Sequence, residues 1–103
     1  MTLLKRPAFS RDLHSHSRYI ARDNPEAARR LLVAAEETCA ALARQPEMGH
    51  QESLRRQAGV RSWRIKGFEN YLIFYGVNPE SVEILRLLYA SRDLPRFFRK
   101  RPL

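Results

Sequence analysis

The sequence has few of the features that mark membrane, disulfide-rich or metal-binding proteins. No apolar run approaches the roughly 20 residues that a membrane-spanning helix needs, and the N-terminus has no apolar stretch of signal-peptide length. The single cysteine, Cys39, cannot form an internal disulfide, and no Cys/His group has metal-ligand spacing. We therefore expect a cytoplasmic protein with no metal ion, no other cofactor and no membrane partner.

Familiar catalytic signatures are also missing. The chain contains no Gly-rich phosphate loop, no paired acid motif and no nucleophile elbow. His14 and His16 lie two residues apart on a predicted helix and point in different directions, so with His50 they make no credible triad or metal set. Cys39 falls on the apolar face of another predicted helix, which favours a buried small hydrophobe over a nucleophile.

The chain does have a large excess of positive charge. It holds 19 Lys and Arg against 11 Asp and Glu, for a net charge of +8, and only Lys5, Lys66 and Lys100 are lysines. Guanidinium groups suit bidentate binding of phosphate or carboxylate. The excess predicts an anionic partner, either nucleic acid or an acidic protein segment, although it can also serve solubility alone.

Two apolar runs near the C-terminus predict the centre of a sheet. Tyr71–Val77 and Val82–Tyr89 are rich in β-branched and aromatic residues, and Asn78-Pro79 between them is a strong turn signal. Both faces of each run are largely apolar, which is typical of central strands that the rest of the chain covers. We expect an antiparallel hairpin whose first strand places one set of alternating residues on one face (Tyr71, Ile73, Tyr75 and Val77) and another on the opposite face (Leu72 and Phe74).

The preceding residues predict a strand and two helices. Thr2 to Arg6 suits a strand, and a thin apolar stripe from Pro7 to Arg22 indicates a helix, interrupted at His16 where an apolar residue is expected. Asn24 is a favoured N-cap for a second helix that ends at Gln45-Pro46. Its apolar face comprises Ala28, Leu31, Leu32, Ala35, Cys39 and Leu42.

Residues 46–59 read as a polar connection, and Val60 to Lys66 alternates like a half-buried strand. The order predicts one α+β domain over residues 1–103, of strand, helix, helix and then three or more antiparallel strands (β-α-α-β-β-β). The helical hairpin packs on one face of the sheet, and residues 94–103 form a basic C-terminal tail.

The open face of the sheet is the strongest candidate binding surface. If Trp63 and Ile65 face the helices, Arg64 and Lys66 face away from them. Tyr89 and Arg92, at the end of the last strand, can approach a bound partner, although a tyrosine there is more often a packing residue.

Arg86 is unusual because it lies inside an apolar strand, where it is expected to share a face with Val82, Ile84 and Leu88. A buried guanidinium is costly without a partner. Either it pairs with a carboxylate, for which Glu69 and Glu83 are the candidates, or it opens onto a binding surface.

The chain resembles the ParE/RelE toxins of bacterial type II toxin–antitoxin modules, and it is closer to ParE. The resemblance covers nearly the whole chain in five segments: DL…YIARDNPEAARRLL from Asp12 to Leu32, LARQPEMG from Leu42, GVRSW from Gly59, YLIFYGV from Tyr71 and VEILRLLYASRDL from Val82. It implies a helical hairpin against an antiparallel sheet. It also implies a growth-inhibiting toxin of the kind linked to plasmid stabilization, held in a hetero-oligomer by an antitoxin whose acidic C-terminal segment wraps it.

The resemblance leaves the target open, because ParE-like members poison DNA gyrase and RelE-like members cleave mRNA on the ribosome. Four residues resemble parts of the ribonuclease site: Arg64, Lys66, Tyr89 and Arg92. However, Leu72 stands where those relatives have an arginine and Phe98 where they have a tyrosine, and a general base is missing.

We therefore favour a gyrase inhibitor that acts by binding, not an enzyme. The alternatives are the ribonuclease and a non-toxic relative that only binds antitoxin. The residues expected to contact antitoxin or target are Arg61, Arg64, Lys66, Arg86, Tyr89 and Arg92.

Overall fold

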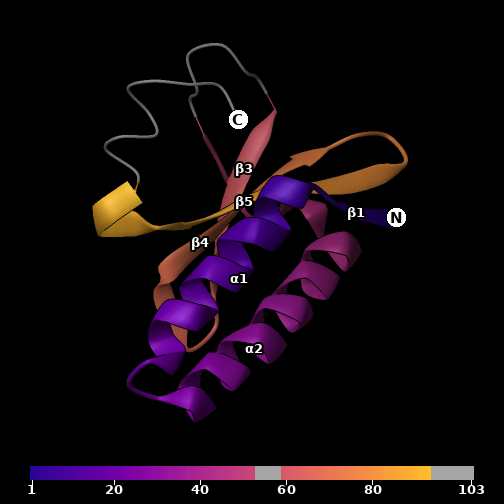
Figure 1. The fold of residues 1–103 in the computed structure, drawn as a ribbon. Helices are drawn as coiled ribbons and strands as arrows, with labels where there is room; N and C mark the ends of the chain where they lie inside the picture. The colour runs from indigo at the N-terminus through magenta and orange to yellow at the C-terminus, as the bar shows by residue number, and fades with distance from the viewer. Residues whose placement is uncertain (53–58, 94–103) are drawn as a thin grey trace.

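Two antiparallel helices cover one face of a five-stranded sheet (Figure 1). The computed structural model describes residues 1–52 and 59–93, and the predicted basic tail, residues 94–103 with Phe98, lies outside the described residues. The elements follow in the order β1 (Thr2–Lys5), α1 (Pro7–Ala21), α2 (Pro25–Arg44), the 3-10 turn η1 (Pro46–Met48), β2 (His50–Gln51), β3 (Val60–Ile65), β4 (Phe68–Val77) and β5 (Ser81–Tyr89).

The two predicted helices are confirmed, and local signals explain where they begin. Pro7 and Pro25 occupy the first turn of α1 and α2, where the missing N–H of proline costs nothing. Asn24 caps α2, because its Oδ1 accepts a hydrogen bond from the N–H of Ala27 at 3.0 Å. The described helices include none that is both long and apolar enough to cross a membrane.

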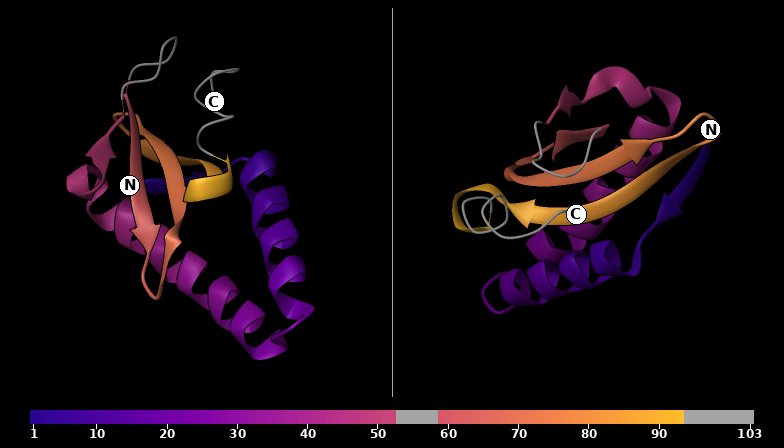
Figure 2. Two further views of the ribbon diagram at one scale, coloured as in Figure 1. Left: turned by 90° about the vertical axis from the view of Figure 1, so that its left-hand side faces the viewer. Right: turned by 90° about the horizontal axis from the view of Figure 1, so that it is seen from above.

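The strands are ordered β1-β5-β4-β3-β2, and the predicted antiparallel arrangement of β3, β4 and β5 is confirmed. Two details at the sheet edges differ from the prediction. β1 pairs with β5 in parallel, and the predicted polar connection contains η1 and the short strand β2. Figure 2 shows the strands as one layer and the helices as the other.

The main core lies between the helices and the sheet. It contains Phe9 of α1, Leu31, Ala35, Cys39 and Leu42 of α2, and the inward side chains of four strands, among them Ile65, Ile73, Tyr75, Val82, Ile84 and Leu87. The prediction of Leu32 on the apolar face is wrong, since 42% of it is exposed and Thr38 is buried instead. The helical period turns Leu32 to the edge of the stripe that passes through Leu31, Ala35 and Leu42.

A β-bulge in β5 changes which residues share a face. Phe74 pairs with Arg86 but Tyr75 pairs with Ile84, so Leu85 is an extra residue. The alternation inverts at this point, and Leu88 therefore lies with Val60, Phe74 and Leu85 in a second buried cluster on the sheet face away from the helices. The prediction that Arg86 shares a face with Val82, Ile84 and Leu88 therefore holds for Leu88 alone, because Arg86 pairs with Phe74 and Leu88 with Leu72 on the face opposite Val82 and Ile84.

Candidate functional site

Side chains of α1 cap the edge of β5 beyond the point where β1 ends. The last contact from the β1 side is the N–H of Arg6, which donates to the carbonyl of Ile84 at 2.9 Å. Farther along β5, Asp12 accepts from the N–H of Leu87 at 3.0 Å, and Nε2 of His16 lies 3.2 Å from the carbonyl oxygen of Leu87. Both free backbone groups of Leu87 are thus satisfied by α1, and this fixes the helix against the strand.

Asp12 is also the partner of Arg86. Its two carboxylate oxygens accept from Nε and Nη2 of Arg86 at 2.7 and 3.1 Å, a bidentate pair that raises the pKa of Arg86, chiefly through the hydrogen bonds. The predicted partners are wrong: Glu83 pairs with Arg6 at 3.0 Å, and Glu69 accepts from a backbone N–H in the β3–β4 turn. Sequence reasoning missed Asp12 because it lies 74 positions away.

His16 explains the interruption in the apolar stripe of α1. A carbonyl oxygen can only accept, so Nε2 carries the proton that it donates to Leu87, and Nδ1 accepts from Nη2 of Arg92 at 3.4 Å. Burial lowers the pKa of His16 and outweighs the opposing effect of Asp93, whose carboxylate is 3.7 Å from Nε2. His16 is therefore neutral at pH 7 and uses both ring nitrogens.

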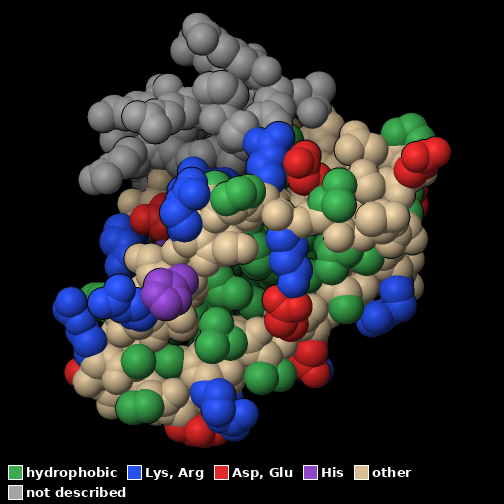
Figure 3. All heavy atoms as spheres, turned by 45° about the vertical axis from the view of Figure 1, so that its right-hand side comes forward, with side chains coloured by type: hydrophobic (Ala, Val, Ile, Leu, Met, Phe, Trp, Pro, Cys, Tyr) green, Lys and Arg blue, Asp and Glu red, His purple; other side chains and the backbone are tan. Residues whose placement is uncertain are grey.

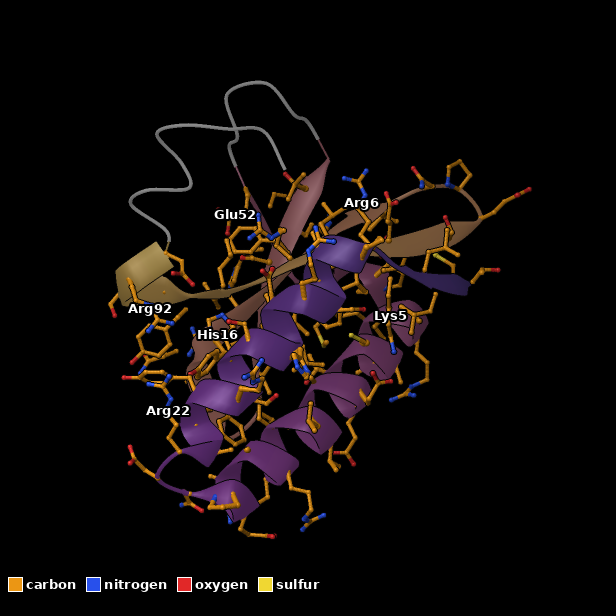
Figure 4. The ribbon with its side chains drawn as sticks, in the orientation of Figure 1. Lys5, Arg6, His16, Arg22, Glu52 and Arg92 are labelled. Atoms are coloured by element: carbon orange, nitrogen blue, oxygen red, sulfur yellow. The ribbon has the colours of Figure 1, made fainter. Side chains whose placement is uncertain are left out.

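Around His16 lies a group of three tyrosines and an arginine, Tyr19, Tyr71, Tyr89 and Arg92, which we name the tyrosine–arginine cluster. The rings of Tyr71 and Tyr89 meet edge to face at 5.0 Å. The guanidinium of Arg92 lies 5.0 Å from the ring centre of Tyr89 and 5.8 Å from that of Tyr19. Figure 4 shows His16, Arg22 and Arg92 on the same side of the molecule, where α1 passes the end of β5.

The tyrosine–arginine cluster is open to solvent on one side and buried on the other. The side chain of Arg92 is 52% exposed and Tyr19 is 59% exposed, so the guanidinium and the ring are both accessible from solvent. Burial is the main cause that raises the pKa of Tyr71, which keeps its hydroxyl protonated at neutral pH. Among residues 1–52 and 59–93, no group of His, Cys, Asp and Glu is placed to hold a metal ion.

The remaining predicted site residues lie elsewhere. Nη1 of Arg61 donates to the carbonyl oxygens of Glu47 and Gly49 at 3.2 and 2.7 Å, so Arg61 holds the connection that follows α2. Arg64 is exposed on the sheet face away from the helices, opposite Leu72 in β4.

Lys66 does not share the face of Arg64, contrary to the prediction. β3 ends at Ile65, and the turn that follows contains Gly67 at φ +85°, so the strand alternation stops before Lys66. Lys66 instead lines a shallow cavity of about 400 Å³ against α2, with Arg30 and Val33.

The structure therefore brings only part of the predicted site together. Tyr89 and Arg92 are in contact, and Tyr89 packs against the core on the helix side of the sheet. Arg64 is on the other side, two strands away, because it pairs with Leu72 and Leu72 pairs with Leu88. The sequence prediction did not include Tyr19 or His16 in the site. The signals that could have indicated them are the polar His16 in the apolar stripe of α1 and Tyr19, three residues farther along the same helix.

Comparison with known proteins identifies the family. A family model described as "ParE toxin of type II toxin-antitoxin system, parDE" matches residues 3–94. The chain belongs to the ParE toxin family. The predicted resemblance to the ParE side of the ParE/RelE toxins is thus confirmed.

The ParE fold is found in a solved structure titled "Chromosomal ParDE TA system from P. aeruginosa". It aligns with a TM-score of 0.74 and 19% sequence identity over 88% of this chain and 97% of that chain, so the likeness is one of fold. The comparison with curated protein sequences finds no match.

Proposed function

We propose that this ParE-family chain is a toxin that inhibits DNA gyrase by binding, and that a cognate acidic antitoxin neutralises it. The family supports a type II toxin, and the similar structure from P. aeruginosa is titled as a ParDE toxin–antitoxin system. The observation that carries the choice of binding over catalysis is the separation of the residues that an RNA-cleaving site needs.

Cleavage of RNA by acid–base catalysis needs a base, an acid and a phosphate-binding cation around one ribose and its phosphate, each within hydrogen-bond reach. Arg64 points away from the helices and Lys66 lies against α2, whereas Tyr89 and Arg92 are at the end of β5 on the helix side. His16 is beside Arg92 but is buried and engaged at both nitrogens. This arrangement favours a recognition surface.

Inducing the chain in bacterial cells tests this proposal, with cleaved DNA–gyrase complexes and mRNA cuts at codons measured in the same cultures. We expect growth arrest with gyrase complexes and no specific mRNA cuts. Arg92→Ala should weaken the arrest, while Arg44→Ala, which removes an exposed charge from α2, should not. Specific mRNA cuts without gyrase complexes would favour the ribonuclease, and unaffected growth would favour a non-toxic relative that binds antitoxin.

The antitoxin would recognise positive charge that the fold leaves exposed. Arg64 on the open sheet face and Lys66 beside α2 are both exposed, and Val33 beside Lys66 is 48% exposed. An acidic amphipathic segment that passes over the edge of β3 would meet both charges and an apolar contact. Arg61 and Arg86 have partners within the fold, and their proposed contribution to binding is to fix the residues that they hold, the connection after α2 and Asp12.

The acidic C-terminal segment of the protein encoded beside this chain is the natural probe for that surface. Arg64→Glu with Lys66→Glu should weaken its binding by about tenfold or more, because both substitutions put like charges opposite the segment. The same two changes to glutamine should have a smaller effect. Unchanged binding in the glutamate variant would place the antitoxin elsewhere.

A further inference from the structure

A row of basic side chains follows the outer face of α1. Arg11, His14, Arg18 and Arg22 are spaced by three, four and four residues, so they form one stripe along the helix, which we name the basic stripe. They line a surface depression of about 660 Å³ together with the hydroxyl-bearing residues Ser10, Ser15 and Tyr19. Figure 3 shows several basic side chains gathered around a histidine on this side of the molecule.

The arginines of the basic stripe have no carboxylate partners among residues 1–52 and 59–93, whereas four of the eight other arginines in these ranges do. Arg6, Arg29, Arg86 and Arg92 each form an ion pair. By contrast, Arg11 and Arg18 form none, and Arg22 has only the ring of Tyr19, 5.8 Å from its guanidinium carbon. Asp12, the one acidic residue of α1, is turned toward β5.

The needs of the helix do not account for this charge. Basic residues near the C-terminal end of a helix are favoured by its dipole, which explains Arg18 and Arg22. Arg11 lies in the second turn of α1, where the dipole gives a cation no advantage, and neighbouring like charges on one face repel each other. The dipole therefore gives no reason for Arg11, and a bound polyanion would relieve the repulsion along the stripe.

The chemistry of the basic stripe fits the sugar–phosphate backbone of a nucleic acid. From Arg11 to Arg22 it spans about 16 Å along the helix, and it offers guanidinium groups, an imidazole and serine hydroxyls, all of which bind phosphate oxygens. A docked protein helix would also require apolar anchors, and among the described residues that line the depression only Tyr19 has a large ring to offer. We propose that the outer face of α1 binds nucleic-acid phosphates, a function that does not depend on the proposed inhibition of gyrase.

The full chain can be titrated against a fluorescent DNA duplex of about 20 base pairs, and against one of its strands, between about 50 and 200 mM salt. In Arg11→Gln/Arg18→Gln, we expect duplex affinity to fall by at least about tenfold and the slope of log K against log salt to shrink by about 2, since each lost phosphate contact removes about 0.9. The matched control, Arg30→Gln/Arg44→Gln, removes the same charge from α2 and should change both values much less. Arg11→Lys/Arg18→Lys keeps the charge and should keep most of the binding.

Comparing the duplex with the single strand identifies which form of nucleic acid supplies the phosphates. The proposal is supported if Arg11→Gln/Arg18→Gln loses affinity for either of them and the control variant does not. Equal losses in the stripe and control variants would overturn it, because the net charge of the chain would then account for the binding. Unchanged DNA binding in the stripe variant would also overturn it. The same chains can be titrated against polyglutamate. If the stripe variant loses polyglutamate binding and retains DNA binding, the occupant is an acidic protein segment and the proposal is overturned.

Discussion

Replacing Asp12 by alanine should lower the free energy of unfolding by about 2–4 kcal/mol. The substitution removes the acceptor for the N–H of Leu87 and both hydrogen bonds to Arg86. An unsatisfied backbone N–H costs about 1–3 kcal/mol, and a hydrogen bond to a charged group contributes about 1.5–3 kcal/mol. Counting the bidentate pair once gives a summed range of about 2.5–6 kcal/mol. The guanidinium side chain is 33% exposed, so water recovers part of the loss and the lower half of that range applies.

Urea unfolding followed by circular dichroism measures this loss as a shift of the midpoint at constant slope. Asp12→Asn should lose less, because its amide oxygen can still accept from Leu87. Glu80→Ala, an exposed residue of the β4–β5 turn, is the control and should stay within about 0.5 kcal/mol of the parent chain.

A double-mutant cycle with Arg86→Leu isolates the pair from the other contacts of Arg86. We expect the double variant to be at least about 1 kcal/mol more stable than the sum of the single losses predicts. Simple additivity, or an Asp12→Ala loss below about 0.5 kcal/mol, would refute the view that this pair holds α1 to β5.

Three further predictions concern the core. Tyr75→Phe should cost about 1–3 kcal/mol in urea unfolding, because the buried N–H of Gly49 donates to the Tyr75 hydroxyl at 2.9 Å and would lose its acceptor; an unchanged midpoint would contradict this. Burial lowers the pKa of His16 in the folded chain, so the free energy of unfolding should fall as the pH drops from about 6.5, the pKa in the unfolded chain, to the lowered pKa in the folded chain. His16→Asn should flatten this fall, whereas His14→Asn should not. Burial raises the pKa of the Cys39 thiol to about 12, so a thiol reagent should react with it only as the chain unfolds, and rapid labelling of the native protein would show the thiol to be accessible.

The elements of the fold were predictable where local chemistry sets them. Asn24 and Pro25 mark the start of α2, and Asn78-Pro79 mark the turn between β4 and β5. β4 begins at Phe68, earlier than predicted, because exposed Glu69 and Asn70 read as a loop although they extend the strand past the buried part of the sheet.

The bulge and the long-range pairs were not predictable from spacing. Most positions of Val82–Tyr89 are apolar on both faces, so the alternation of polar and apolar residues does not reveal that Leu85 is an extra residue. The parallel pairing of β1 with β5 and the bond from Asp12 to Arg86 join distant parts of the chain, and they depend on where the helical hairpin places α1.

The candidate site was predictable only where it lies on one strand. Tyr89 and Arg92 are close in sequence and were expected to act at the end of β5, but Tyr19 and His16 join them only because α1 crosses that end. The predicted strand includes Lys66, one residue beyond the end of β3, and for that reason the prediction places Arg64 and Lys66 on one face.

Residues on the two sides of α1 should respond differently to substitution, which allows experiments to separate residues that contact a partner from residues that position others. Asp12 and His16 on the inner side fix the end of β5, and through His16 they also orient Arg92. Substitutions there should lower stability and partner binding together. Arg11 and Arg18 on the outer side have no partner among the described residues, so their loss should change binding and leave the unfolding midpoint within about 0.5 kcal/mol. A toxin variant that loses activity without losing stability therefore identifies a contact residue, and measuring both properties for each variant separates the recognition surface from the scaffold that holds it.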